Sequence, residues 1–449
     1  MKKENTLKYM NYSWVIYIFY GLLTIYIIAL LYAKIDSPFW FHQPIYHSYE
    51  IYPKLAWSKK PYWKRKRSVK LGIFCNIECI ETWELSDFQQ MHSTHDHTSK
   101  LCSLLQGYYV DNEYTLFYCT KDYLTKVMGG RGFVSCYREN TLVKPSTQSS
   151  TVQSLKPYLS VPNYDRFYGC IMSRPTMVYF HYYPEYNCEI HFWDFLCVHD
   201  MYKDRLLSRN LIQTHIYNHC NREKSFSGGY CFLKYNELCK GIVPLVQFDT
   251  YHFILKRVKF HKLPVHYRIY TLNQNHVDLW RSIYWQITST FEVAFMPSFE
   301  STIEWLSNER YVIYATVYKE NAVEHVHGVY FFEKTQKTWL NDSIAQPDVI
   351  RLAGCMKFVG NNLHLHDPNE ILFFRGFLNC LQEFLLQNGE KQTKPQGILE
   401  IPSIGHNKKL LPKWREKYEL NSKIPCAYYL YNLVYPSSPV QDDQFLFLA

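Results

Sequence analysis

The strongest constraint on this chain is an uncharged run close to its start, SWVIYIFYGLLTIYIIALLYA, at residues 13–33. About 20 apolar residues in a helix cross the hydrocarbon core of a bilayer, so this run predicts a membrane-spanning helix. Trp14 and Tyr17 at one end and Tyr32 at the other are residue types that favour membrane interfaces. A signal peptide is the alternative, but the bulky YAKIDSPFW that follows lacks a small-residue cleavage site. We therefore expect an uncleaved, single-pass anchor over residues 1–35.

The charges beside this run do not decide its orientation. Three lysines precede it, Lys34 follows it, and a basic run at 59–67 begins about 25 residues further on, where charges count less. The fourteen cysteines form no CxxC pair and no regular framework. Such a distribution in a long chain favours free thiols in a reducing compartment. We therefore expect the part of the chain after the anchor to face the cytosol.

Composition excludes disorder and gives a first indication of partners. The 449 residues are 47% hydrophobic and 18% aromatic, with 40 tyrosines, which is ample for a large core. The net charge of +9 suggests an anionic ligand or a membrane surface and argues against a dedicated nucleic-acid binder. The basic run KKPYWKRKR leaves three interpretations open: a nuclear or nucleic-acid signal, attraction to anionic lipid, and a merely solvated arm.

The pattern of apolar residues predicts a mixed α/β (α+β) fold with mostly antiparallel central sheets. Stretches rich in β-formers predict strands at 176–184, 189–199, 310–320, 325–334 and 426–436. Helical spacing predicts helices at 205–220, 278–291, 299–309 and 370–389, and a polar, serine-rich loop is expected at 139–155. The two halves share a similar order of elements. We divide the chain into an anchor (1–35), an extended, proline-punctuated basic arm (36–70), and two halves, 71–258 and 259–449.

The best local signal for chemistry is FWDFLCVHDMYKDRLLSRNLI at 192–212, where a strand ends, a charged turn follows and a helix begins. Backbone N–H groups at the strand end can stabilise a developing oxyanion. Those at the helix N-terminus can bind phosphate, and Lys203, Arg205 and Arg209 add positive charge nearby. From the residues alone, the more common outcome is that such a strand–turn–helix unit binds nothing.

This stretch and four others resemble the N-myristoyltransferase family, the glycylpeptide N-tetradecanoyltransferases of the GNAT fold class. The segments occur in the family's order along most of 37–449: SPFWFHQPI (37–45), YYVDNEYTLFY (108–118), FLCVH (195–199), GHNKKLLPKW (405–414) and AYYLYN (427–432). The resemblance implies two tandem GNAT-like halves. The first would bind acyl-CoA as a co-substrate, without a permanently bound cofactor, and the second would form the peptide side.

The resemblance also implies the site residues. Backbone N–H groups of Phe195 and Leu196 would form the oxyanion hole. Acyl-CoA would contact Pro38, Phe39, Trp40, Phe195, Leu196, Cys197, Val198, Lys203, Asp204, Arg205, Leu206, Leu207 and Ser208. The acceptor, a protein with an N-terminal glycine, would contact Asp111, Asn112, Tyr114, Leu116 and Asn407.

The family's general base is the α-carboxylate of the final residue, which here would be Ala449. The chain ends in DQFLFLA, an unusually apolar terminus. A free α-carboxyl has a pKa of roughly 3.5, and burial would raise it toward the range useful for a base. From the residues alone, completion of a core strand by Phe445–Phe447 is the favoured interpretation, so the role of Ala449 rests on the resemblance.

Several positions depart from the family pattern. Leu206 stands where the family has arginine, Asp204 where it has a small hydroxyl residue, and the acidic substrate loop is reduced to Asp111 and Glu113. These losses of charge favour an alternative: a catalytically inactive, membrane-anchored protein with a binding or structural role, for example in a virion membrane. The tyrosine-rich composition would suit a large DNA virus.

A metal site is not expected. HSTHDH places His92, His95 and His97 one residue away from the metallo-hydrolase spacing, and LHLHDP places His364 and His366 in no known ligand pattern.

Overall fold

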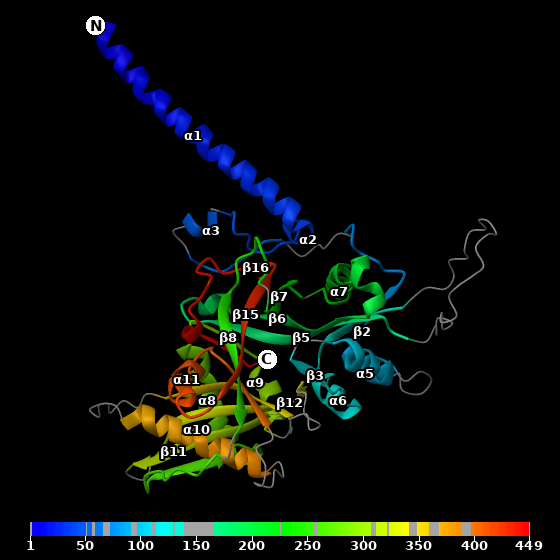
Figure 1. Cartoon of the computed structure of the whole chain (residues 1–449), viewed down its shortest axis with the longest axis vertical. Helices are drawn as coiled ribbons and strands as arrows, with labels where there is room; N and C mark the ends of the chain where they lie inside the picture. Colours follow the sequence, from blue (N-terminus) through cyan, green and yellow to red (C-terminus); the bar gives the residue numbers. More distant parts are fainter. Residues whose placement is uncertain are drawn as a thin grey trace, which may run out of the picture.

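In the computed structural model, one long helix projects from a mixed α/β body (Figure 1). The structure describes residues 2–448, apart from 51, 56–58, 66–71, 91–96, 110–113, 129–130, 139–165, 225, 237, 256–257, 307–310, 321–322, 341–347, 359–367 and 388–396. The expected loop at 139–155 and the last two residues of the helix expected at 370–389 therefore lie outside the described residues.

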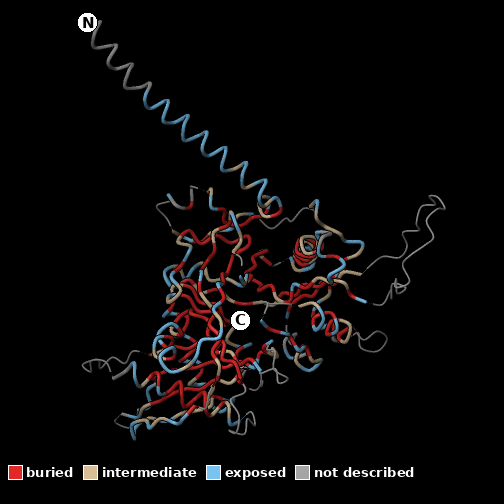
Figure 2. Tube along the Cα trace, in the orientation of Figure 1, coloured by how far each residue is buried: buried red, intermediate tan, exposed pale blue. Residues whose placement is uncertain are grey.

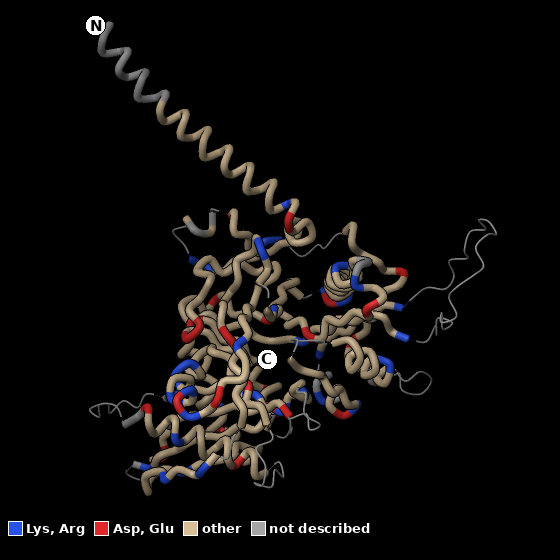
Figure 3. Tube along the Cα trace, in the orientation of Figure 1, with Lys and Arg blue, Asp and Glu red and all other residues tan. Residues whose placement is uncertain are grey.

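The projecting helix is α1 (Lys2–Asp36). Its segment Trp14–Asp36 has a mean hydropathy of 2.3, and none of it is buried in the body (Figure 2). Over the described side chains, charge appears only at the end that joins the body (Figure 3). The apolar helix predicted from the sequence is thus present, and it is long and apolar enough to cross a membrane.

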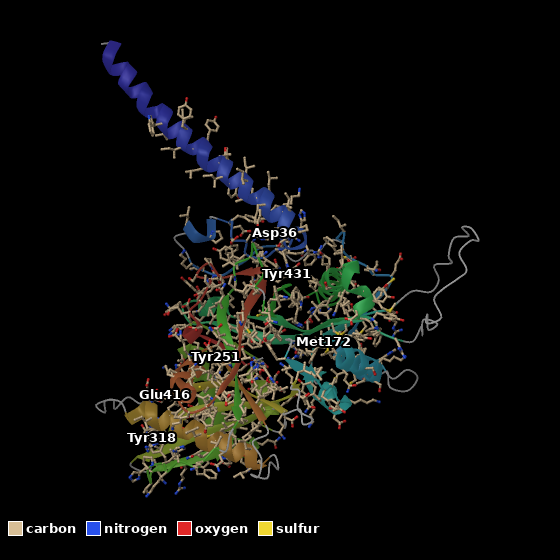
Figure 4. The ribbon with its side chains drawn as sticks, viewed as in Figure 1. Asp36, Met172, Tyr251, Tyr318, Glu416 and Tyr431 are labelled. Carbon is tan, nitrogen blue, oxygen red and sulfur yellow. The ribbon has the colours of Figure 1, made fainter. Side chains whose placement is uncertain are left out.

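The arm after α1 packs against the body instead of extending from it. Its regular elements are α2 (Pro38–Phe41), α3 (Tyr52–Leu55) and β1 (Tyr62–Trp63). Ile45 forms an isolated bridge with Tyr431, and the Gln43 side chain accepts a hydrogen bond from the Tyr431 hydroxyl at 2.9 Å. Gln43 also donates to Gln213 at 3.1 Å. In Figure 4, Tyr431 lies just beyond Asp36, at the base of α1. The arm therefore ties the helix to the body.

The rest of the first half alternates strands and helices. Its elements are β2 (Ile80–Glu84), α4 (Leu85–Gln90), α5 (His97–Tyr108), β3 (Thr115–Phe117), α6 (Lys121–Met128), β4 (Phe133–Tyr137), β5 (Gly169–Phe180), β6 (Cys188–Val198), α7 (Leu207–Arg222), β7 (Tyr230–Tyr235) and β8 (Val246–Leu255). The two strands and the helix expected between 176 and 220 are β5, β6 and α7.

The second half begins after β8. Its elements are β9 (Tyr267–Thr271), α8 (Val277–Thr290), β10 (Val293–Met296), α9 (Phe299–Trp305), β11 (Tyr311–Glu320), β12 (Val323–Trp339), β13 (Asp348–Lys357), α10 (Pro368–Gln387), β14 (Gly397–Pro402), α11 (Asn407–Arg415), β15 (Leu420–Tyr431), β16 (Leu433–Val434) and β17 (Phe445–Phe447).

Within the described residues, fifteen strands form one sheet. The longest path through it runs β17-β10-β5-β6-β7-β15-β8-β14-β13-β12-β11-β9, and β2, β3 and β4 branch from it. Most pairs are antiparallel; β6–β7, β10–β17 and β13–β14 are parallel. The fold is therefore α/β with a mostly antiparallel sheet, as expected. Because β15 lies between β7 and β8 and β10 lies beside β5, strands from both halves share this sheet. The division at 258/259 stays a prediction.

Helices bury their apolar stripes on this sheet. Phe373, Phe377 and Phe384 occur at helical spacing in α10 and contact Tyr330 and Phe332 of β12, with ring centroids 5.2–6.0 Å apart. Each fully buried phenylalanine contributes about 1.5–3 kcal/mol. On the other half of the sheet, α7 packs in the same way, and its N-terminus is held at one wall of the cavity described next.

Candidate active site

A cavity of about 450 Å³ opens where the arm, the first half and the C-terminal strand meet. One part of its lining is apolar and aromatic, and another part is charged. The apolar part includes Phe39, Trp40, Tyr109, Phe117, Ile171, Phe192, Phe195, Leu196, Ile212, Phe232 and Phe447. The charged part includes Arg174, Asp194, Arg209, Lys234, Glu333, Lys337 and Arg351. An apolar cavity with a few converging polar groups is the usual form of a small-molecule site.

A β-bulge in β6 borders the cavity. Asp194 faces Met172 and Cys197 faces Cys170, so Phe195 and Leu196 together oppose Ile171 alone. Phe195 has φ +49°, a left-handed conformation that is unusual for a residue with a side chain. Such bulges turn backbone groups out of the ladder and concentrate near functional sites. Phe195 and Leu196, expected to form an oxyanion hole, thus lie at the cavity wall in an irregular backbone. The Phe195 N–H donates to the Asp194 carboxylate at 3.0 Å.

The N-terminus of α7 forms the adjacent wall. Leu206 has φ +57° and occupies the N-cap position, where its apolar side chain cannot accept a hydrogen bond from the first helical N–H groups. The Arg209 N–H donates to the Leu206 carbonyl at 3.0 Å, whereas the N–H groups of Leu207 and Ser208 precede the first intrahelical bond and, with the helix dipole, favour an anion. Ser208 and Arg209 line the cavity here. This combination of open N–H groups and a guanidinium is suited to phosphate.

The arm forms a third wall. Trp40 stacks on Phe232 with their ring planes 6° apart and centroids separated by 5.4 Å. Phe39 packs edge-on against Trp40, and the Arg209 guanidinium lies 6.0 Å from the Phe39 ring. Pro38 begins the short helix α2, where the fixed φ of proline suits the first position. The two aromatic residues predicted in the arm therefore border the cavity next to the predicted phosphate turn.

The remaining residues of the predicted cofactor set whose side chains the structure describes do not line the cavity. Cys197 is buried and its thiol contacts the Leu104 carbonyl. Val198 pairs with Gly169, and Leu207 is buried under the turn. Lys203 is exposed and forms an ion pair with Asp200 at 2.6 Å. Asp204 and Arg205 belong to the 3₁₀ helix Asp200–Arg205, but their side chains lie outside the described residues.

The C-terminal strand completes the cavity. β17 runs parallel to β10, and the Leu448 N–H donates to the Phe295 carbonyl at 2.8 Å. Phe447 lines the cavity, whereas Leu448 is 2% exposed. The described chain thus ends inside the body, one residue before Ala449, which lies outside the described residues. The apolar tail noted in the sequence is a buried strand.

Comparison with solved structures identifies the architecture. A structure of Saccharomyces cerevisiae N-myristoyltransferase with bound myristoyl-CoA matches at a TM-score of 0.62 and 14% identity, covering 90% of this chain and 94% of the yeast chain. The chain has the N-myristoyltransferase fold. A second yeast structure with bound myristoyl-CoA matches at 0.63 and 12%, covering 91% and 90% of the two chains. A third, with bound myristoyl-CoA and inhibitors, matches at 0.61 and 13%, covering 93% and 94%.

The likeness lies in structure and not in detectable sequence similarity. No protein-family model matches the chain, and neither does any curated protein sequence. Because the identities are only 12–14%, these structural matches establish the N-myristoyltransferase fold and nothing beyond the fold.

The residues expected on the peptide side are spread over the surface and core. Tyr114 is exposed and stacks on Trp339 with their planes 3° apart. Leu116 is exposed on β3, opposite Thr338. Asn407 is buried, and its amide donates to the Leu352 and Pro402 carbonyls. None of these three lines the cavity, and Asp111 and Asn112 lie outside the described residues.

Apart from Arg209, the charged part of the cavity was not predicted from the sequence. Arg174 pairs with Asp194 at 2.8 Å, and Arg351 lies 3.2 Å from Glu400 and 3.8 Å from Glu333. These residues come from β5, β6, β12, β13 and β14, and no sequence motif links them. Only the strand order brings them together.

Glu400 is the centre of this buried network. Burial alone would raise the pKa of its carboxyl, but Lys337, His252 and Arg351 together hold that pKa well below its usual range. His252 lies 3.6 Å from Glu400. Glu400 is therefore a buried anion that neutralises cationic groups beside the cavity.

Proposed function

We propose that this protein is an acyltransferase that moves a fatty acyl group, myristoyl in the first instance, from acyl-CoA to the N-terminal glycine amine of a protein. The observation that carries the proposal is the convergence of three features on one cavity. The β6 bulge supplies Phe195 and Leu196, the uncapped start of α7 supplies an anion site, and β17 brings the C-terminal residues to the wall at Phe447.

Acyl-CoA is the proposed co-substrate, and the lining of the cavity suits its two chemical parts. The apolar walls would take the acyl chain, and Phe39 and Trp40 would pack against the bound molecule. The pyrophosphate would lie on the turn at 203–208, where α7 begins and Arg209 adds charge. The solved structures with this fold that bind myristoyl-CoA support this assignment.

The proposed reaction is the transfer of an acyl group from the thioester of acyl-CoA to the glycine amine. The glycine amine attacks the thioester carbonyl carbon, and the oxygen becomes an oxyanion that the N–H groups of Phe195 and Leu196 would stabilise. For Phe195, this requires its N–H to turn away from the Asp194 carboxylate. The C–S bond then breaks, the second proton lost by the attacking nitrogen goes to the leaving sulfur, CoA leaves as the thiol, and an amide forms. The proton lost by the ammonium goes to a general base before the attack.

The proposed base is the α-carboxylate of Ala449. Ala449 follows Leu448 by one peptide bond, and Leu448 is buried next to a residue that lines the cavity. In water, an α-carboxyl with a pKa of roughly 3.5 would be too weak a base for a glycine ammonium of pKa about 8. Placement away from water would narrow this gap, because desolvation disfavours the charged carboxylate.

We place the acceptor on the side of the cavity formed by β3 and the second half. Tyr114, Leu116, Asn407, Asp111 and Asn112 are its proposed contacts. Asn407 would act by positioning, because its side chain holds β13 and β14 carbonyls. We propose no nucleic-acid partner.

The protein is further proposed to be anchored in a membrane by α1, with its body in the cytosol. Only Ser37 and Pro38 separate α1 from Phe39, so the cavity would lie close to the bilayer surface. Fatty acyl-CoA partitions to membranes, and tethering an enzyme where its substrate concentrates raises the effective concentration. The viral setting stays a prediction.

A second candidate function is an inactive binding or structural module with the same fold. It is favoured by the phosphate turn, where Leu206 replaces the expected arginine and Lys203 pairs with Asp200. Both features reduce the charge available to CoA.

One experiment separates the two functions. The full chain, purified in detergent, is incubated with radiolabelled myristoyl-CoA and a peptide that begins with glycine. The enzyme proposal predicts labelled peptide, and the same peptide with a blocked amine should stay unlabelled. CoA binding without labelled peptide, or no binding at all, would overturn the enzyme proposal and support the module.

A further inference from the structure

A cluster of two histidines and a glutamate lies outside the cavity. His191 is on β6, His219 is in the last turn of α7, and Glu223 follows directly after that helix. One potential ligand atom from each residue lies within 4.8 Å of the other two. Nε2 of His219 is 3.1 Å from the Glu223 carboxylate, and the two imidazole centroids are 4.3 Å apart. None of the three lines the cavity.

The outer nitrogens of both histidines are already held. Nδ1 of His191 is 3.1 Å from the Ser173 hydroxyl, and Nδ1 of His219 is 2.8 Å from the Tyr230 hydroxyl. Nε2 of His219 then faces the Glu223 carboxylate, to which it is hydrogen-bonded at 3.1 Å, and Nε2 of His191 is left for another partner. A hydrogen bond on the second ring nitrogen is typical of metal-binding histidines, because it fixes the orientation and tautomer of the ring. Phe133 and Phe226 pack on the His219 ring at 4.0 and 4.2 Å and restrict its movement.

The two rings are buried and the carboxylate is partly exposed. His191 and His219 are 2% and 0% exposed. Glu223 differs, because its side chain is 37% exposed. Exposure at this one ligand provides an entry path and space for a coordinated water molecule.

We propose that His191, His219 and Glu223 bind a divalent transition-metal ion of the zinc class, with water in the remaining position. Two imidazoles and one carboxylate are a known zinc ligand set. Bonds of 2.0–2.2 Å place tetrahedral ligand atoms about 3.4 Å apart, so the His219–Glu223 separation of 3.1 Å would widen slightly and separations of up to 4.8 Å would contract by up to about 1.4 Å. The ion would clamp the C-terminal end of α7 to β6. The other end of the same helix carries Ser208 and Arg209 at the cavity.

The sequence does not reveal this site. Both histidines lie in elements whose periodicity marks them as core, and 28 positions separate them. The histidine-rich stretches HSTHDH and LHLHDP lie elsewhere in the chain. Strand β7 connects the two histidines in space. Tyr230 pairs with His191 in the sheet, and its hydroxyl contacts His219.

The test uses Co²⁺ as the probe, because the fourteen thiols of this chain could also bind zinc. The full chain carries a purification tag without histidines, is stripped with EDTA and is titrated with Co²⁺ in detergent. We expect one equivalent to give visible d–d bands without the near-ultraviolet thiolate charge-transfer band. Failure to bind, or a spectrum dominated by thiolate bands, would overturn the proposal.

Variants locate the ion. Glu223→Gln, at a half-exposed position that tolerates the change, should weaken Co²⁺ binding at least tenfold, and His191→Asn should do the same. Tyr230→Phe removes only the outer hydrogen bond to His219 and should weaken binding about tenfold. Glu189→Gln is the matched control, because Glu189 is an exposed carboxylate near Glu223 without a ligand role. Unchanged binding in the Glu223→Gln variant would overturn the assignment whether or not the His191→Asn variant folds.

Discussion

Phe447 stacks on Tyr428, with ring centroids 4.3 Å apart and planes 22° from parallel. Tyr428 belongs to β15, in the middle of the sheet, and Phe447 belongs to β17 at one end of it. The stack therefore links the C-terminal residues to the strand that joins both halves, and it does so at the cavity wall.

This stack should be important for stability. Replacing Phe447 with alanine should lower the free energy of unfolding by about 3–5 kcal/mol, because a large buried ring is lost and a cavity remains. Phe447→Leu keeps an apolar side chain and should cost less. Denaturant unfolding of both variants measures the difference. Equal stability of wild type and Phe447→Ala would show that the tail is not held as described.

The chain terminus should be essential for turnover but not for folding. Deleting Ala449, or adding two glycines after it, should reduce acyl transfer at least a hundredfold, because the proposed base is lost or displaced. CoA binding and the thermal midpoint should change little. The same glycines inserted before Lys2 serve as the control. Full activity with an extended C-terminus would remove Ala449 from the mechanism.

Arg209 should contribute to CoA affinity. Arg209→Gln should weaken CoA binding by about 1.5–3 kcal/mol, the usual contribution of a charge-assisted contact, as measured by calorimetry with desulfo-CoA. Arg222→Gln removes the same charge at the far end of the same helix and should leave affinity unchanged. If both variants bind CoA equally, the anion site is not at the start of α7.

Glu400 should make stability depend on pH. Its folded pKa lies below its unfolded value of about 4.3, so its contribution is present above that pH and is lost as pH falls through the folded pKa. Glu400→Gln should cost about 3–5 kcal/mol at pH 7, because it leaves buried cationic groups unpaired. Unfolding from pH 7 to pH 3 should show the difference between wild type and variant shrinking below about pH 4. A constant difference would contradict the network.

Helix α1 should hold the chain in membranes. Arginine at both Ile18 and Ile25 should prevent insertion, since each charge near the centre of a spanning helix costs about 2.5–3.5 kcal/mol. The double leucine substitution at the same positions is the control. Alkaline extraction of membranes should release the arginine variant and retain the leucine variant. Retention of both would show that α1 is not the anchor.

The predictions from sequence succeeded where a signal is local. The uncharged run gave α1 by its length, the helical spacing of apolar residues gave α7 and α10, and runs of β-formers gave β5 and β6. Features that depend on strand order could not be predicted from the sequence. Arg351 and Glu400 meet because β13 pairs with β14, and His191 meets His219 because α7 packs on β6. The left-handed backbone at Phe195 has no sequence signal, because nothing in its side chain favours positive φ.

The position of β15 has a consequence for how the chain is made. A ribosome produces β7 and β8 well before residues 420–431, the strand that lies between them. During that interval both strands present open edges, which in other proteins invite pairing with a second chain. Elongation must therefore finish most of the second half before the first half can close its sheet. A chain inserted in a membrane through α1 would stay separated from free chains until its own residues 420–431 had been synthesised.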